Sequence, residues 1–243
     1  MVVKKMKTVG FEHLHCHSEY SILDGLASIS ELCQRWQDHG DYICVTDHGL
    51  MGAIPSLIST TENFEKKKFH PIFGCELYTN PIHNEPTENE EARDKFIKNL
   101  SPQEFEEFKV SSHILAIAIT NKGYENLTKI CSLGWSQGFY RKPRVNHNIL
   151  KQYREGIVFT SCCCASEAAR ALRVRGKEVA EATVLKYKEM FGENFYLEMM
   201  LLDFEYQHEY DKFLVEMHIK HNIPMIIRSE EHTSELQSHL NLV

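Results

Sequence analysis

Short apolar runs alternate along the chain with longer segments in which apolar residues recur every third or fourth position. Short runs predict buried strands, whereas the longer period predicts amphipathic helices. The candidate strands are residues 11–16, 42–46, 71–78, 113–120, 156–161, 194–200 and 223–227. The candidate helices are residues 28–40, 123–135 and 165–192, the first of which would present Ile29, Leu32, Cys33 and Trp36 on one face.

This alternation of strands and helices predicts an α/β fold built on a parallel sheet or barrel. In such folds, reactive groups gather at the carboxyl ends of the strands. The polar, acidic segment 80–96 interrupts the alternation. We expect it to be a solvated loop, because charge-rich stretches of this kind usually face water.

Composition narrows the class of protein. With 243 residues and 42% hydrophobic content, the chain can bury a full core, and one large domain is expected. The formal charge of −7 argues against a domain that binds DNA by electrostatics alone. Eight irregularly spaced cysteines do not resemble a disulfide framework. Since the sequence also has no secretion signal and no apolar stretch of membrane length, we predict a cytoplasmic protein with no membrane contact.

The first candidate strand carries a histidine at every second position, in the stretch FEHLHCHSEYSILDG. Because side chains alternate across a strand, His13, His15 and His17 would share one face, and Asp24 follows them. Imidazole and carboxylate groups are typical ligands of zinc, manganese and iron. We therefore predict a metal site here, with His13, deeper in the strand, in a structural role.

Other candidate ligands also end or interrupt apolar runs. Asp47 and His48 end the second run, and Glu76 lies inside the third, where an unpaired buried carboxylate would cost several kcal/mol. A metal ion would remove that cost, although a glutamate at a solvated strand end remains an alternative. His113 begins the fourth run and, taken alone, would be a surface residue. The fifth run leads into thiols at residues 162–164, which could bind a metal or simply pack.

Taken in order, these motifs resemble the polymerase and histidinol phosphatase (PHP) family. The stretches FEHLHCHSEYSILDG, VTDHGLMGA, PIFGCELY, NKGYENLTKICSLG, GFYRKPRV and FGENFYLEM are similar to the PHP domains of bacterial replicative DNA polymerases. The resemblance covers residues 10–227 and implies a distorted, seven-stranded (β/α)7 PHP barrel, truncated at its C-terminal end.

The resemblance also implies a centre of up to three divalent metal ions, which are zinc, manganese or iron across the family. Its ligands would be His15, His17, Asp24, His48, Glu76, His113 and Cys163. The family's Ser-Ala-Cys-Leu pattern selects Cys163 and leaves Cys162 and Cys164 as packing residues. Asp47 would be a supporting carboxylate beside His48.

Clustered cations promote phosphoester hydrolysis, and the activity that the resemblance implies is a 3′→5′ exonuclease in DNA replication. The six histidine and carboxylate ligands would then be the catalytic residues. The basic residues Arg141, Lys142 and Arg144 would contact the substrate backbone, with a solvated loop as the alternative. The implied partners are a DNA 3′ end and other replicase domains and subunits. The polymerase active site is expected beyond this chain.

After Ile227 the sequence departs from the family. A segment such as Thr-Asn-Asp-Val-His is expected there, and its aspartate and histidine would complete the ligand set. The stretch RSEEHTSELQSH, residues 228–239, instead resembles a short-read sequencing adapter translated in one frame. We therefore expect a PHP domain over residues 1–227 and a tail of non-native origin over residues 228–243. His232 and His239 are not expected to replace the missing ligands.

Two other functions fit parts of this pattern. One is a stand-alone PHP phosphomonoesterase that acts on a small metabolite, as a histidinol phosphatase does. The other is a catalytically inert scaffold of the replicase. The polymerase-like motifs argue against the first, and the intact ligands at seven positions argue against the second.

Overall fold

The computed structural model describes residues 12–22, 24–37, 40–80, 90–201 and 205–228. The strands are β1 (Tyr42–Val45), β2 (His70–Thr79), β3 (Ser112–Ala118), β4 (Phe139–Tyr140), β5 (Lys142–Val145), β6 (Ile157–Thr160), β7 (Phe195–Met200) and β8 (Met225–Arg228). The helices are α1 (Ile29–Trp36), α2 (Ile54–Glu62), α3 (Glu90–Lys98), α4 (Pro102–Phe108), α5 (Asn121–Ser136), α6 (His147–Gln152), α7 (Glu167–Arg175), α8 (Lys177–Phe191) and α9 (Glu205–His221), with a 3-10 turn at Gly192–Asn194. No helix in these ranges is long and apolar enough to cross a membrane.

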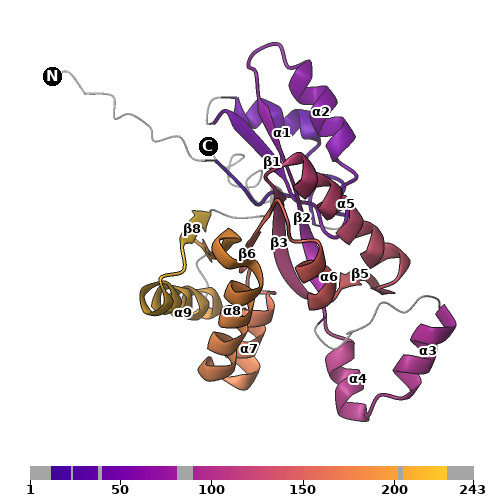
Figure 1. Ribbon diagram of the computed structural model, residues 1–243. Coiled ribbons are helices and arrows are strands. Elements are labelled where there is room, and N and C mark those ends of the chain that lie inside the picture. Colours follow the sequence, from indigo (N-terminus) through magenta and orange to yellow (C-terminus); the bar gives the residue numbers. More distant parts are fainter. Residues whose placement is uncertain (1–11, 23, 38–39, 81–89, 202–204, 229–243) are drawn as a thin grey trace.

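The strands of the described residues form one curled sheet in the order β4-β5-β2-β3-β6-β7-β8, with β1 also paired to β2 (Figure 1). Helices α7, α8 and α9 lie together toward β6 and β8, α5 and α6 lie nearer β5, and α1 and α2 cover the β1 end. This curled sheet with its helices agrees with the predicted α/β PHP barrel.

The predicted parallel pairing does not hold for β3, which runs antiparallel to both β2 and β6, or for the β4–β5 pair. The pairs β1–β2, β2–β5, β6–β7 and β7–β8 are parallel, as expected. The reason lies in the connection from β2 to β3, where α3 and α4 project from one end of the sheet instead of crossing over it (Figure 1). A chain that leaves and returns at the same end of a sheet forms an antiparallel pair.

The pleat of β2 and β3 divides their side chains between two faces. Cys75 and Leu77 of β2 join the large core under the helices, whereas Glu76, opposite Leu115, faces the other way. On that second face, Leu115 belongs to a small apolar cluster with Ile117, Cys162, Cys163 and Met200. The alternation therefore places one carboxylate inside the curl of the sheet, next to two thiols.

Helix α1 confirms the predicted amphipathic pattern. Ser28 and Glu31 form a capping box at its start. Ile29, Leu32 and Cys33 are buried against β1 and α2, and Trp36 packs at the edge of this cluster. The predicted helix 165–192 is instead two helices, because Gly176 adopts φ +90° between α7 and α8. That conformation is open to glycine and ends a helix.

The predicted strand 11–16 does not form within residues 12–16, which are irregular. The main chain pairs with the end of β1 at one point, where Cys16 O accepts from Thr46 N. Further back, the carboxylate of Glu12, rather than main-chain oxygen, accepts the N–H groups of Asp41 and Tyr42. Hydrogen bonds to the Glu12 side chain therefore replace main-chain strand pairing at this point.

The acidic segment 80–96 is only partly the loop that was expected. Residues 81–89 lie outside the described ranges, whereas residues 90–96 belong to helix α3. Helix α4 follows, with a capping box between Ser101 and Glu104 and Pro102 at its first position. The charge-rich residues 90–96 are therefore helical rather than a coil.

Candidate metal centre

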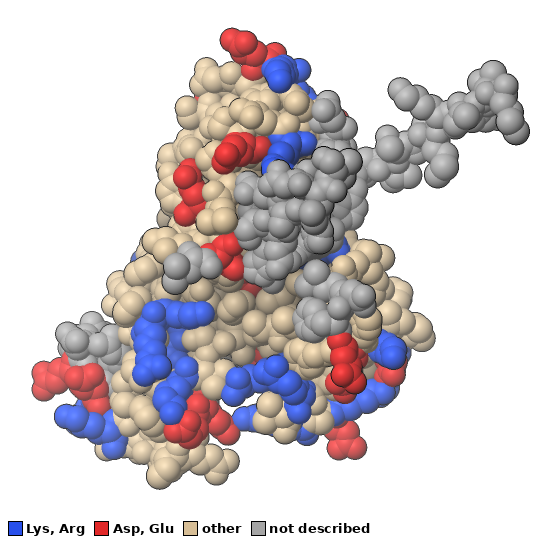
Figure 2. Space-filling view, turned by 180° about the vertical axis from the view of Figure 1, so that it is seen from behind, with Lys and Arg blue, Asp and Glu red and all other residues tan. Residues whose placement is uncertain are grey.

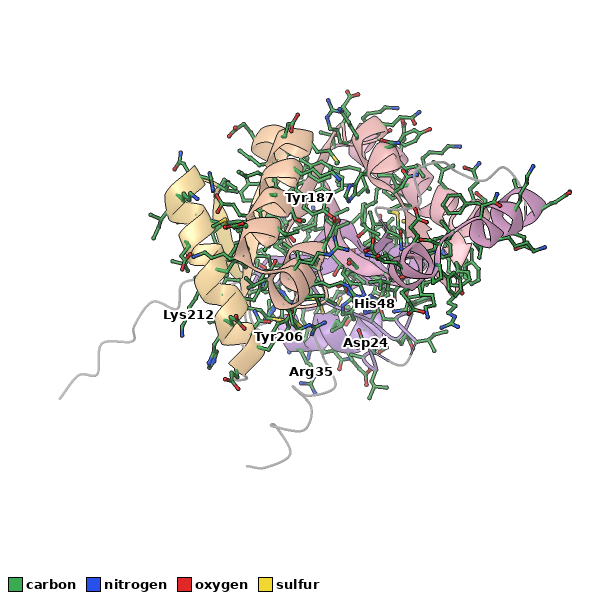
Figure 3. All side chains as sticks on the ribbon, turned by 90° about the horizontal axis from the view of Figure 1, so that it is seen from below. Asp24, Arg35, His48, Tyr187, Tyr206 and Lys212 are labelled. Atoms are coloured by element: carbon green, nitrogen blue, oxygen red, sulfur yellow. The ribbon has the colours of Figure 1, made fainter. Side chains whose placement is uncertain are left out.

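Seven predicted ligands come from separate parts of the chain and converge on the inner face of the sheet. His15, His17 and Asp24 precede α1, His48 follows β1, Glu76 lies within β2, His113 lies in β3 and Cys163 follows β6. Figure 3 shows Asp24 and His48 close together on the side seen from below. The structure thus brings all seven predicted ligands to one site.

Glu76 is the centre of this cluster and is almost fully buried. Its Oε2 lies near three imidazole nitrogens, and its Oε1 near a fourth. The distances are 3.3 Å to His15 Nε2, 3.0 Å to His17 Nε2, 3.1 Å to His48 Nδ1 and 2.7 Å to His113 Nδ1. The alternative of a solvated glutamate is therefore wrong, since this carboxylate is enclosed by imidazoles.

Asp24 lies on the solvent side of the cluster. Its carboxylate is 2.7 Å from His48 Nε2 and 3.8 Å from His17 Nε2. Asp24, His48 and His113 are partly exposed, whereas His15, His17 and Glu76 are buried. The centre therefore has a closed floor and one side that is open to solvent.

The donor atoms form four overlapping groups, within each of which they lie within 4.8 Å of one another. The groups are His15–His17–Glu76, His17–Asp24–His48, His48–Glu76–His113 and Glu76–Cys162–Cys163. Nitrogen, carboxylate oxygen and sulfur donors are the set that zinc, manganese and iron accept. The residues present therefore fit a centre of several divalent metal ions, with Glu76 shared among three groups.

Mutual electrostatics between the imidazoles and carboxylates govern the protonation of the site. Burial raises the pKa of Glu76, but His113 and His15 outweigh this effect and hold the pKa well below its ordinary value. Burial and Arg228 lower the pKa of His15, yet Glu198 and Glu76 overcome both and raise it to about 10. The paired carboxylates therefore favour the protonated form of His15.

Glu198 is a site residue that the sequence analysis missed. It lies in β7, is buried, and accepts a hydrogen bond from His15 Nδ1 at 2.7 Å. It also contacts Thr160 Oγ1 and forms an ion pair with Arg228. Burial raises its pKa, but His15 and Arg228 lower it to about 2. The available signal was a carboxylate within the apolar run NFYLEMM, the same signal that singled out Glu76.

Asp47 lies behind the ligands. Its carboxylate accepts hydrogen bonds from Ser18 N at 2.8 Å and from Ser21 Oγ at 2.7 Å. Ser21 Oγ in turn lies 3.1 Å from His17 Nδ1 and accepts from His48 N. Asp47 therefore holds Ser21, which contacts the ring of His17 and the main chain of His48, and this is the geometry of a supporting carboxylate.

His13 lies outside the four groups and packs edge-on against Trp36, with ring centroids 4.3 Å apart. This geometry suits the predicted structural role.

The structure does not single out Cys163 as the thiol ligand, as the resemblance implied. Cys162 Sγ is 3.1 Å from Glu76 Oε1, and Cys163 Sγ is 3.5 Å from the same atom. Both thiols therefore belong to the centre on geometry, and Cys162 is not merely a packing residue.

The predicted basic residues divide into two kinds. Arg141 and Lys142 are exposed, and Lys142 Nζ lies 4.3 Å from the centroid of the Tyr78 ring. Arg144 is 1% exposed, donates to Phe108 O, and has its guanidinium over the rings of Phe108 and Tyr140. The prediction that Arg144 contacts a substrate is therefore contradicted by its burial, which gives it a structural role.

Comparison with known proteins identifies the class. The PHP domain model matches residues 13–201, and the chain belongs to the PHP domain family. Among curated proteins it is similar to DNA polymerase III subunit alpha of Borreliella burgdorferi, with 31% identity over 224 residues, and to that of Helicobacter pylori, with 32% identity over 234 residues. Each match covers 91% of this chain and 18% of the relative. The chain thus spans about a fifth of the length of these relatives.

Proposed function

We propose that this chain is the amino-terminal PHP domain of a replicative DNA polymerase III alpha subunit and that its centre hydrolyses the terminal phosphodiester bond at a DNA 3′ end. The observation that carries the proposal is the group of four imidazoles around one buried carboxylate, with Asp24 at the open side. The similarity to polymerase alpha subunits selects DNA as the substrate. The implied setting is the bacterial cytoplasm, beside other replicase domains and subunits.

When bound, divalent zinc, manganese or iron ions would supply an activated water and stabilise charge on the phosphoryl oxygens. His15, His17 and Glu76 would hold ions at the floor of the site, with Cys163 and Cys162 beside them. Glu198 accepts the Nδ1 proton of His15, which leaves Nε2 directed toward Glu76.

Asp24, His48 and His113 would meet the substrate, because they line the open side. Ser21, held by Asp47, accepts the Nδ1 proton of His17 and so fixes that ring with Nε2 toward the ligands. The chain therefore presents its donor nitrogens in fixed directions before any substrate arrives, which is the preorganisation that this chemistry needs.

The tail remains a separate proposal. We infer that residues from Arg228 onward are not those of the native gene, since the stretch resembles translated adapter. Residues 229–243 lie outside the described ranges, and Arg228 ends β8 with its side chain against Glu198. Sequencing genomic DNA across codon 228 tests this directly, and a genomic reading frame with the same tail would disprove it.

The test of function uses the protein encoded at the genomic locus, loaded with Mn²⁺ or Zn²⁺. Single-stranded DNA labelled at its 5′ end should shorten stepwise from the 3′ end, and chelation should stop the reaction. His15→Ala and Glu76→Ala should abolish shortening and leave primer extension largely intact. His70→Ala, at an exposed histidine of β2, is the matched control.

Two outcomes would favour the alternatives. A protein that extends primers and holds its metals, yet shows no nuclease above the His15→Ala background, would be a scaffold. A protein that releases phosphate from small phosphomonoesters and leaves DNA untouched would be a stand-alone phosphatase.

A further inference from the structure

Two exposed aromatic rings lie stacked beside the metal centre. Trp135, near the end of α5, and Phe139 of β4 have ring centroids 5.4 Å apart and an interplanar angle of 20°. Trp135 is 49% exposed and Phe139 is 38% exposed. Large apolar side chains are usually buried, so a stacked and exposed pair next to a reactive site calls for a ligand with a flat face.

The pair is bonded to the residue that follows a predicted ligand. Trp135 Nε1 donates a hydrogen bond of 2.9 Å to Gly49 O, and Gly49 follows His48 in the chain. Tyr78 then stacks on His48 with ring centroids 5.5 Å apart, and Lys142 Nζ lies over the Tyr78 ring. His48 is one of the residues on the open side of the centre, so the aromatic rings and the Lys142 ammonium group border that side.

Close backbone contacts hold this surface in place. A Cβ atom at Gly138 would lie 1.8 Å from Arg144 O, and one at Gly134 would lie 3.1 Å from Pro143 O. These glycines let α5 and β4 approach β5 closely. The buried Arg144 side chain anchors the same hairpin. The surface is therefore formed before a ligand binds, which lowers the entropic cost of binding.

We propose that Trp135 and Phe139 form a stacking platform for bases near the 3′ end of single-stranded DNA. Lys142 and Arg141 contact its phosphates. The proposal rests on the proposed function, because it names how the substrate of the same centre is held. Aromatic faces accept any base, and nearby cations follow the backbone, which is the usual way in which single strands are bound without sequence preference.

Backbone strain agrees with this role. On the face seen in Figure 2, Lys and Arg side chains are more frequent in the lower half, where Asp and Glu side chains lie among them, so charge alone does not define the surface. Arg141, between β4 and β5, adopts φ +62°, a conformation that is uncommon for a residue with a side chain. Such positions concentrate at ligand-binding turns.

The first test uses the full 243-residue chain without metal, so that DNA is bound and not cleaved. The sequence has two tryptophans, Trp36 and Trp135. Trp36→Phe therefore leaves Trp135 as the only tryptophan reporter. Its fluorescence should be quenched when (dT)12 is added and should not change when a duplex without single-stranded ends is added. Unchanged fluorescence at saturating (dT)12 would overturn the proposal.

The second test measures affinity for labelled (dT)12 and for a 12-mer of the same length whose sites are all abasic. Trp135→Leu should weaken (dT)12 binding by roughly 5- to 150-fold, the usual effect of losing one stacked base. It should leave abasic binding unchanged, whereas Trp135→Phe should bind (dT)12 almost as the parent does. Lys142→Ala should weaken both probes and lower the salt slope by about 0.7.

Tyr124→Leu is the matched control, because Tyr124 is an exposed aromatic residue of the same helix, near its other end. Equal losses from Trp135→Leu and Tyr124→Leu, or equal losses on both probes, would overturn the platform. Intact DNA binding in Trp135→Leu, with loss of contact to another replicase subunit, would assign the surface to a protein partner. Failure of the nuclease alone would leave Trp135-dependent binding intact, so the two proposals fail separately.

Discussion

Replacing Glu76 by glutamine should affect more metal positions than replacing any other ligand. Glu76 belongs to three of the four donor groups, whereas Asp24 belongs to one. Glutamine keeps the shape of the side chain and removes the charge that four imidazoles share. We therefore expect Glu76→Gln to weaken binding of several ions and Asp24→Asn to weaken binding of one.

The expected loss of metal affinity depends on whether a residue binds the ion directly or lies behind a ligand. Changes to residues behind the ligands already cost roughly 10- to 100-fold in metal affinity, so loss of a direct ligand should cost at least that much for each affected ion. This corresponds to about 1.4 to 2.8 kcal/mol or more per ion. In the metal-free chain, the same substitution leaves His15 with one buried carboxylate fewer.

Removing one partner of a buried ion pair costs about 3–5 kcal/mol. For a domain of this size each kcal/mol lowers Tm by roughly 2–4 °C, so Glu76→Gln should lower the metal-free Tm by roughly 6–20 °C. Asp24 is partly exposed, and we expect a smaller decrease for Asp24→Asn.

The assay is metal content by mass spectrometry after dialysis against a graded chelator, together with thermal unfolding in EDTA. Parent, Glu76→Gln and Asp24→Asn are compared at equal protein concentration. If Asp24→Asn loses as many ions as Glu76→Gln, Glu76 is not the shared ligand. If Glu76→Gln proves too unstable to purify, the number of ions lost by Asp24→Asn and by His113→Ala still tests the grouping, since each should lose one.

Three further outcomes follow from the contacts around the centre. Glu198→Gln should reduce metal affinity by roughly 10-fold, because the amide oxygen can still accept a hydrogen bond from His15 Nδ1 but carries no charge. Unchanged affinity would show that Glu198 does not support the site. The metal-free Tm should decrease between about pH 6.5 and pH 10, because folding raises the pKa of His15 to about 10. Protonated His15 stabilises the fold fully below its ordinary pKa, and this stabilisation is lost above the raised pKa. A Tm that stays flat over this range would contradict the pairing of His15 with the carboxylates. Gly123→Ala should destabilise the chain by about 1–3 kcal/mol in chemical denaturation, since its Cβ would lie 1.8 Å from Gly156 O, and a cost no greater than that of Gly134→Ala would refute this packing argument.

The ligand types could be read from the sequence because metal binding depends on local chemistry. Histidines at alternate positions, and a carboxylate within an apolar run, are unusual unless something binds them. Glu76 could be identified on this ground, whereas Glu198, in an equally short motif, was not predicted. Single polar residues in strands are ambiguous until their neighbours are known.

The class of fold was also present in the sequence, since alternating strand and helix periods determine which layers can pack. The register and direction of each strand were not, because they depend on how the connections run in space. Helices α3 and α4 return the chain at the end from which it left, and β3 becomes antiparallel as a result.

Only the tertiary structure separated Arg144 from its neighbours Arg141 and Lys142. Three basic residues within four positions look alike in sequence, but burial depends on what packs on each side chain. Phe108 and Tyr140 cover Arg144, while Arg141 and Lys142 remain exposed. The pairing of Trp135 with Phe139 was likewise decided by close packing of α5 on the β4–β5 hairpin, because a distance between side chains arises from contacts between segments and not from either segment alone.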